Sequence, residues 1–153
     1  MNKEIQDNMA FFDMCSAEDL YNKLKYEFEI LNKNHIPYNY MNFIFTARHL
    51  EDWILKDKNK EMKQRCRNVL NFNINQEWST IVSLCNREKH FYKSPEYEKK
   101  KIKNTGLFDF GNIDFSNFSF ITSSYEVQVG NVMKDLDCVC NKIMNDYKII
   151  FEE

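Results

Sequence analysis

Glycine and proline are scarce in this chain, with 3 and 2 residues respectively among 153. Because these residues form most tight turns, their scarcity excludes collagen-like chains and turn-rich barrels and favours long helices. The chain also lacks an excess of one charge, since 21 basic residues stand against 23 acidic residues and the net charge is −2. A near-neutral chain is poorly suited to coating DNA or a membrane surface.

Long hydrophobic runs are missing as well. The apolar runs at 41–47 and 81–85 are far shorter than the roughly 20 residues that span a membrane. Acidic residues occupy the N-terminal stretch, where a signal peptide needs basic ones. The 5 cysteines are odd in number and lack the spacing of a metal or disulfide framework. We therefore expect a cytoplasmic protein without membrane contact, cofactor or metal, in which four or five of the cysteines are small buried residues.

Helical periodicity dominates the rest of the sequence. Apolar residues recur every three or four positions, the spacing of one helical face, and predict helices over 17–33, 39–57, 59–72, 76–91 and about 130–150. Ser16 with Asp19 three residues later resembles the capping box that begins many helices. The last predicted helix opens at Gly130 and Asn131, and its apolar stripe contains Val132, Leu136, Val139, Ile143 and Tyr147.

A β-rich insert is predicted between the fourth and fifth helices, at about 106–129. Aromatic and apolar residues alternate there with polar ones, a period of two that is typical of strands. The pattern places strands at Phe108 and Phe110, at Phe118 and Phe120, and at 125–129. The predicted fold is a single domain over 1–153, mainly α, with a four- to five-helix bundle and a small β-hairpin or meander before the C-terminal helix.

Residues 47–53 form the first of two polar clusters on predicted helices. Arg48 can pair with Glu51 or Asp52 on the same helical face, and this would make the cluster a solvated, ion-paired surface. Alternatively, Arg48 or His49 faces a cleft and holds a phosphate. His35, which lies beside Pro37 in a predicted turn, is expected to be a solvated loop residue.

The second polar cluster lies at the end of the fourth predicted helix. Arg87 and His90 are three residues apart and are therefore neighbours on one face, with Asn86 and Lys89 close in sequence. Metal-free cleavage of RNA by its 2′-hydroxyl needs an acid or base that titrates near neutrality and a cation for the phosphorane. His90 and Arg87 are residues of these two types. Alternatively, basic residues in a last turn simply favour the negative end of the helix dipole.

At these two clusters the chain resembles the HEPN superfamily of small helical bundles, over roughly 17–91 and the last helix. Only two residues separate Arg87 from His90, whereas the family pattern has a longer interval. The resemblance implies a homodimeric, metal-independent endoribonuclease of a toxin–antitoxin or phage-defence system, with Arg87 and His90 as catalytic residues. Substrate contacts would come from Arg48, His49, Asn86, Lys89, Lys99, Lys100 and Lys101.

Two other functions fit the same sequence. A non-catalytic helical interaction protein, antitoxin-like or an accessory subunit, would use the Phe-rich segment 108–120 as an interface, because aromatic residues are favoured at interface cores. A nucleic-acid-binding module would use the basic stretch 93–103, although the near-neutral net charge disfavours it.

Overall fold

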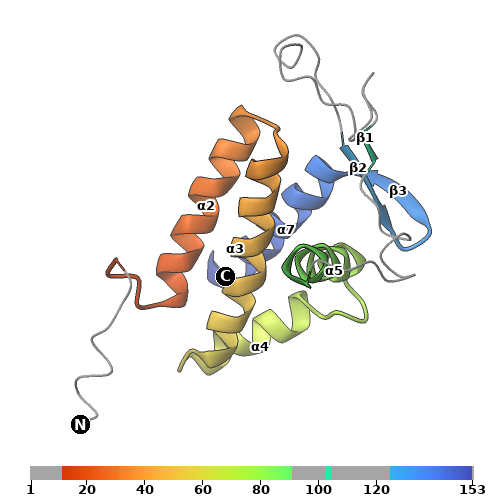
Figure 1. The fold of residues 1–153 in the computed structure, drawn as a ribbon. Coiled ribbons are helices and arrows are strands. Elements are labelled where there is room, and N and C mark those ends of the chain that lie inside the picture. The colour runs from red at the N-terminus through yellow and green to blue at the C-terminus, as the bar shows by residue number, and fades with distance from the viewer. Residues whose placement is uncertain (1–11, 91–102, 105–124, 153) are drawn as a thin grey trace.

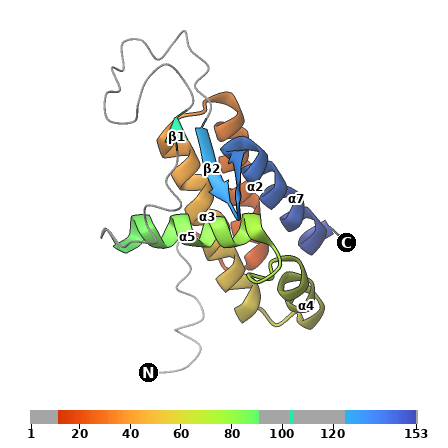
Figure 2. The same cartoon turned by 90° about the vertical axis from the view of Figure 1, so that its right-hand side faces the viewer.

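The fold is mainly helical, as predicted. A computed structural model describes residues 12–90, 103–104 and 125–152. These residues form helices α2 (Ala17–Lys33), α3 (Pro37–Lys56), α4 (Lys60–Val69), α5 (Gln76–His90) and α7 (Leu136–Glu152), and strands β1 (Lys103–Asn104), β2 (Tyr125–Val129) and β3 (Val132–Asp135). Figure 1 shows α2 and α3 side by side and the β2–β3 hairpin beside α5. In Figure 2, α5 runs across α3.

Local signals explain where α2 begins. The Ser16 hydroxyl accepts a hydrogen bond from the Asp19 N–H at 3.1 Å, and the Asp19 carboxylate accepts one from the Ser16 N–H at 3.0 Å. This is the predicted capping box, and it satisfies two backbone donors that would otherwise lack partners at the helix end. The three hydrogen bonds from Cys15 and Ser16 lower the pKa of Asp19.

The other early helices differ slightly from their predicted bounds. α3 begins at Pro37, because proline fits the first turn of a helix, where its missing N–H is not needed. α4 ends earlier than predicted, and a turn at Asn71 follows it. The Asn71 carbonyl accepts the Asn75 N–H at 2.7 Å, and the Asn71 side chain accepts the Asn73 N–H at 3.0 Å. Asparagine stabilises such turns by bonding its own neighbouring backbone.

The predicted start of the last helix is wrong. Gly130 and Asn131 form the turn of an antiparallel hairpin, in which Val129 pairs with Val132, and α7 begins only at Leu136. Gly130 has a φ of 60°, a conformation that two-residue hairpin turns require and glycine supplies. Val132 is therefore a strand residue. The remainder of the predicted stripe is confirmed as buried: Leu136, Val139, Ile143 and Tyr147.

The sheet has the order β1–β2–β3, and both strand pairs are antiparallel. The predicted strand at 125–129 is confirmed, with the alternating burial of a half-covered strand. Asn104 pairs with Tyr125, so β1 begins at the last residue of the basic stretch 93–103, where no strand was predicted. The other two predicted strands, at Phe108 and Phe110 and at Phe118 and Phe120, lie outside the described residues.

One hydrophobic core joins the helices to the inner face of the sheet. Its largest fully buried side chains include Trp78, Tyr125, Tyr147 and Phe43. The prediction that four or five cysteines are buried is wrong, because Cys15 and Cys138 are exposed and the buried ones are Cys66, Cys85 and Cys140. Cys15 precedes the first described helix. Cys138 and Cys140 lie two residues apart on α7, so they point to different sides.

Candidate functional site

The first polar cluster is an ion-paired group on α3. The Arg48 Nη1 lies 2.8 Å from Glu51 Oε2 and 3.0 Å from Asp52 Oδ1. The pairing predicted from the i, i+3 and i, i+4 spacing is therefore confirmed. With one cation between two anions, the group carries a formal charge of −1 at neutral pH.

Burial sets the electrostatics of this group. Burial raises the pKa of Glu51, and the opposing effect of Arg48 does not cancel the rise. For Arg48, burial alone would lower the pKa of the guanidinium, but Glu51 and Asp52 reverse the sign, so the net shift is upward. Arg48 therefore keeps its proton, and its charge is directed toward carboxylates of its own helix.

The group lies where four helices meet. The indole of Trp78 on α5 donates a hydrogen bond to Glu51, and the hydroxyl of Tyr147 on α7 donates to the Ala47 carbonyl of α3. Burial raises the pKa of Cys66 on α4 to about 12, and the nearby Glu51 adds to the rise. The α3 cluster therefore fixes helix packing as well as carrying charge.

The second cluster lies on α5, close to the first at one point. Cys85 of α5 is one of the groups that raise the pKa of Arg48. Arg48 therefore lies near Cys85, the residue that precedes Asn86. Asn86 is exposed on α5, and His49 is exposed on α3. The last turn of α5 contains Arg87, Lys89 and His90, whose side chains lie outside the described part of the chain, as do residues 99–101 with Lys99, Lys100 and Lys101.

A polar cluster of three residues that was not predicted from the sequence surrounds Asp137. The Tyr40 hydroxyl donates to Asp137 Oδ1 at 2.6 Å, and His35 Nδ1 lies 3.0 Å from the same oxygen. An ionised carboxylate only accepts hydrogen bonds, so Nδ1 must carry the proton when His35 bonds this oxygen. His35 is exposed, as predicted, but it is held in place by α7.

Burial and the bond to Asp137 raise the pKa of Tyr40 well above its usual value, so its hydroxyl remains a donor at every physiological pH. A carboxylate that orients an imidazole is an arrangement found in acid–base sites. No local pattern in the sequence could reveal this contact, since His35 and Asp137 are 102 positions apart.

A small open cavity lies between the start of α2 and the end of α3. Its volume is about 280 Å³. The lining combines an exposed thiol, an indole and one charge of each sign: Cys15, Ser16, Ala17, Trp53, Lys56 and Asp57. Among the described residues, no group of three or more His, Cys, Asp or Glu side chains could hold a metal ion. No helix in the described ranges is both long and apolar enough to cross a membrane.

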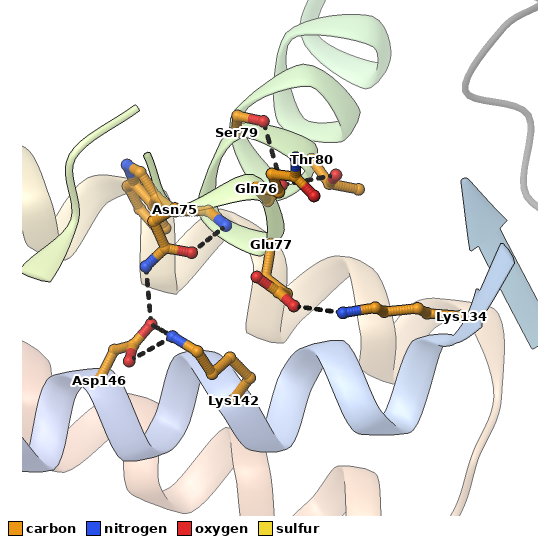
Figure 3. A network of polar contacts seen from close by, with 9 residues as sticks. Asn75, Gln76, Glu77, Ser79, Thr80, Lys134, Lys142 and Asp146 are labelled. Carbon is orange, nitrogen blue, oxygen red and sulfur yellow. Dashed lines mark hydrogen bonds and ion pairs between the residues drawn. The ribbon is translucent and has the colours of Figure 1, made fainter. Parts of the chain in front are cut away.

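A polar network fixes the α4–α5 connection and the hairpin to the bundle. Figure 3 shows Asn75 reaching Asp146 of α7, which also binds Lys142, and Glu77 of α5 paired with Lys134 of β3. Asn75 Nδ2 donates to Asp146 Oδ2 at 2.9 Å, and Lys134 Nζ lies 2.7 Å from Glu77 Oε1. These contacts hold the α4–α5 connection against α7 and the β2–β3 hairpin against α5.

Exposed apolar side chains occur on both of these segments. Phe72 and Ile74 in the α4–α5 connection are 54% and 78% exposed, and Val132 at the start of β3 is 58% exposed. We name this surface the neutral face, because its exposed residues carry no charge. They are Phe72, Asn73, Ile74, Gln76, Gly130, Asn131 and Val132.

Comparisons with protein-family models, with curated proteins and with solved structures found no match to this chain.

Proposed function

We propose that this protein is a non-catalytic helical interaction protein, which acts by binding another protein through the neutral face. The observation that carries the proposal is the exposure of Phe72, Ile74 and Val132 on two neighbouring segments. Exposed apolar side chains with a polar surround are characteristic of protein-binding surfaces. The rim here is formed by asparagine and glutamine, whose amides can hydrogen-bond a partner without the desolvation cost of a charge.

The charge of the α3 cluster favours binding over RNA cleavage. A phosphate that approached Arg48 would also meet Glu51 and Asp52, which already bind this guanidinium at 2.8 and 3.0 Å. Repulsion from two carboxylates opposes the attraction of one cation. Arg48 is therefore a poor phosphate ligand in this arrangement, and the functional interpretation of the first cluster loses its central residue.

The test is a quantitative capture experiment with three baits in the source cell extract: the wild type, Ile74→Asp and Tyr26→Asp. Tyr26 is the matched control, because it is also exposed (61%) but lies on α2. A central apolar interface residue contributes about 2 kcal/mol or more, so Ile74→Asp should reduce capture of the specific partner by at least about tenfold. Tyr26→Asp should capture it like the wild type.

Two results would contradict this proposal. One is a partner that binds the Ile74→Asp bait as well as it binds the wild type. The other is a wild-type bait that captures nothing beyond the proteins retained by Ile74→Asp. Both variants change exposed positions, so their unfolding free energies should stay within about 0.5 kcal/mol of the wild type, which circular dichroism can verify.

A metal-independent endoribonuclease of the HEPN type, acting as a toxin or phage-defence effector, is the second candidate. One observation favours it: α5 extends without a break to His90, so Arg87 and His90 remain one turn apart on the same helix. In this candidate His90 serves as general acid or base and Arg87 holds the scissile phosphate, while Lys89 guides the RNA backbone.

Cleavage of labelled total RNA in EDTA tests the second candidate. Wild-type protein should cut, and His90→Gln should lose cutting by at least about a hundredfold, the usual contribution of a general acid or base. His35→Gln is the matched control and should cut like the wild type. If no RNA is cut at high protein concentration, or if His90→Gln cuts at the wild-type rate, the ribonuclease candidate is wrong.

A further inference from the structure

Two uncharged runs of the sequence meet in the folded protein. Residues 70–76 and residues 127–133 contain no Asp, Glu, Lys, Arg or His, although charged residues make up 29% of the chain. The first run contains the α4–α5 connection, and the second contains the turn of the β2–β3 hairpin. In Figure 1 both lie on the right-hand side of the molecule, next to α5.

Direct contacts hold the two runs together. A Cβ atom placed on Gly130 would lie 2.9 Å from Gln76 Oε1, so the hairpin turn rests against the first residue of α5. The Lys134–Glu77 ion pair fixes the same hairpin one residue further along α5. Val132 points to the same face of the hairpin as Lys134, two residues away, and so toward the α5 side.

The absence of charge on the neutral face allows two copies of it to pack against each other. In a two-fold symmetric dimer the same patch is present on both subunits, so any unpaired charge near the centre meets a like charge. None of the exposed residues of the neutral face is charged. Charges beside it are opposite in sign and paired: Glu77 lies 2.7 Å from Lys134, and Asp146, which Asn75 contacts, lies 2.7 Å from Lys142. Two copies can therefore meet here without like-charge repulsion.

We propose that the neutral face is the contact surface between two copies of this chain, with Ile74, Phe72 and Val132 at the centre of a symmetric dimer. This inference rests on the proposed function, because it names the partner of the same face. Three apolar side chains cover only part of the roughly 800 Å² per subunit of a standard interface, and the exposed amide side chains of Asn73, Gln76 and Asn131 add to this surface. Such a contact gives a reversible dimer.

Sedimentation equilibrium of the full chain tests the dimer at protein concentrations from about 1 to 100 µM. The wild type should shift from monomer toward dimer over this range. Ile74→Asp should weaken the dimer at least tenfold, because it sets two carboxylates near the symmetry axis, whereas the control Tyr26→Asp should leave it unchanged. Val132→Asp, on the other segment, should weaken the dimer as Ile74→Asp does, so the result does not depend on one variant.

Salt gives an independent readout. Because the neutral face has no unpaired charge, the dimer constant should change by less than about twofold between 50 and 500 mM NaCl. A wild type that remains monomeric at 100 µM would overturn the dimer, as would an Ile74→Asp variant that dimerises normally. If the protein is monomeric but capture of another protein still depends on Ile74, the proposed function stands and only the identity of the partner is wrong.

Discussion

Asn75 joins α4, α5 and α7 through three hydrogen bonds, so its loss should destabilise the fold. Its Oδ1 accepts the Trp78 N–H at 3.0 Å and so caps the start of α5, while its Nδ2 donates to the Val69 carbonyl at 2.8 Å and to Asp146 Oδ2 at 2.9 Å. One amide therefore satisfies backbone groups of α4 and α5 and one carboxylate of α7. Asp146 also accepts from Lys142, but it is only 4% exposed, so water cannot readily replace the bond from Asn75.

The substitution Asn75→Ala removes all three contacts. Loss of a helix cap costs about 1 kcal/mol, and loss of each of the two hydrogen bonds that Nδ2 donates costs about 1 kcal/mol more. We expect a total loss of about 2–4 kcal/mol, which lowers the melting temperature of a protein of this size by roughly 5–12 °C. Urea unfolding followed by circular dichroism measures the free energy directly.

Asn68→Ala provides the matched control. Asn68 accepts a hydrogen bond from Gln64 at 3.0 Å, but this amide pair is exposed on α4, so its loss should cost no more than about 0.5 kcal/mol. A double-mutant cycle of Asn75→Ala with Asp146→Ala should show a coupling of at least about 0.5 kcal/mol. An Asn75→Ala variant as stable as Asn68→Ala, or strictly additive losses in the cycle, would refute this explanation.

Three further predictions follow from burial, charge and backbone geometry. In native protein a thiol reagent at pH 8 should modify the exposed Cys15 and Cys138 quickly and the three buried cysteines only after denaturation. Burial raises the pKa of Cys66 to about 12 and keeps the reagent away from all three buried thiols, so equal rates for all five would contradict the fold. The bond from the Lys134 ammonium lowers the pKa of Glu77 below 4.5, so the stabilisation by this ion pair is complete above pH 4.5 and is lost as the pH falls through the lowered pKa. Glu77→Gln should therefore cost up to about 1 kcal/mol at pH 7 and progressively less on acidification, and a cost that does not change with pH would be inconsistent with the pairing. Gly130→Ala should lower the free energy of unfolding by about 1–2 kcal/mol, because it adds strain at a φ of 60° and crowds the Gln76 side chain. Thermal melts measure this loss, and an unchanged melting temperature would contradict it.

Local signals in the sequence were sufficient for α2 and for the ion pairs of α3. The capping residues Ser16 and Asp19 are three positions apart, and Arg48 is three and four positions from its carboxylates, so helical spacing alone determines these contacts. The start of α7 could not be predicted in the same way. Val132 fits a helical stripe and a strand equally well, and its pairing with Val129 across the turn determines the outcome.

The contacts that the sequence concealed are those between distant segments. The indole of Trp78 meets Glu51 only because α5 crosses α3, and the His35–Asp137 contact joins positions 102 residues apart. Neither spacing has a periodic signature. The exposure of Phe72 and Ile74 was equally hard to predict, because apolar residues of these types are usually buried. Both lie in a turn whose backbone hydrogen bonds leave their side chains at the surface.

The pairing of Asn104 with Tyr125 has a consequence for how the sequence can change. These two described residues lie opposite each other in the sheet, although they are 21 positions apart in the sequence. When two points of a chain are already held together, lengthening a flexible connection between them costs little closure entropy, about 0.6 kcal/mol for each doubling. The scaffold therefore contains a natural insertion point, at which evolution or an engineer can exchange sequence while the five helices and the hairpin of the described structure keep their connections.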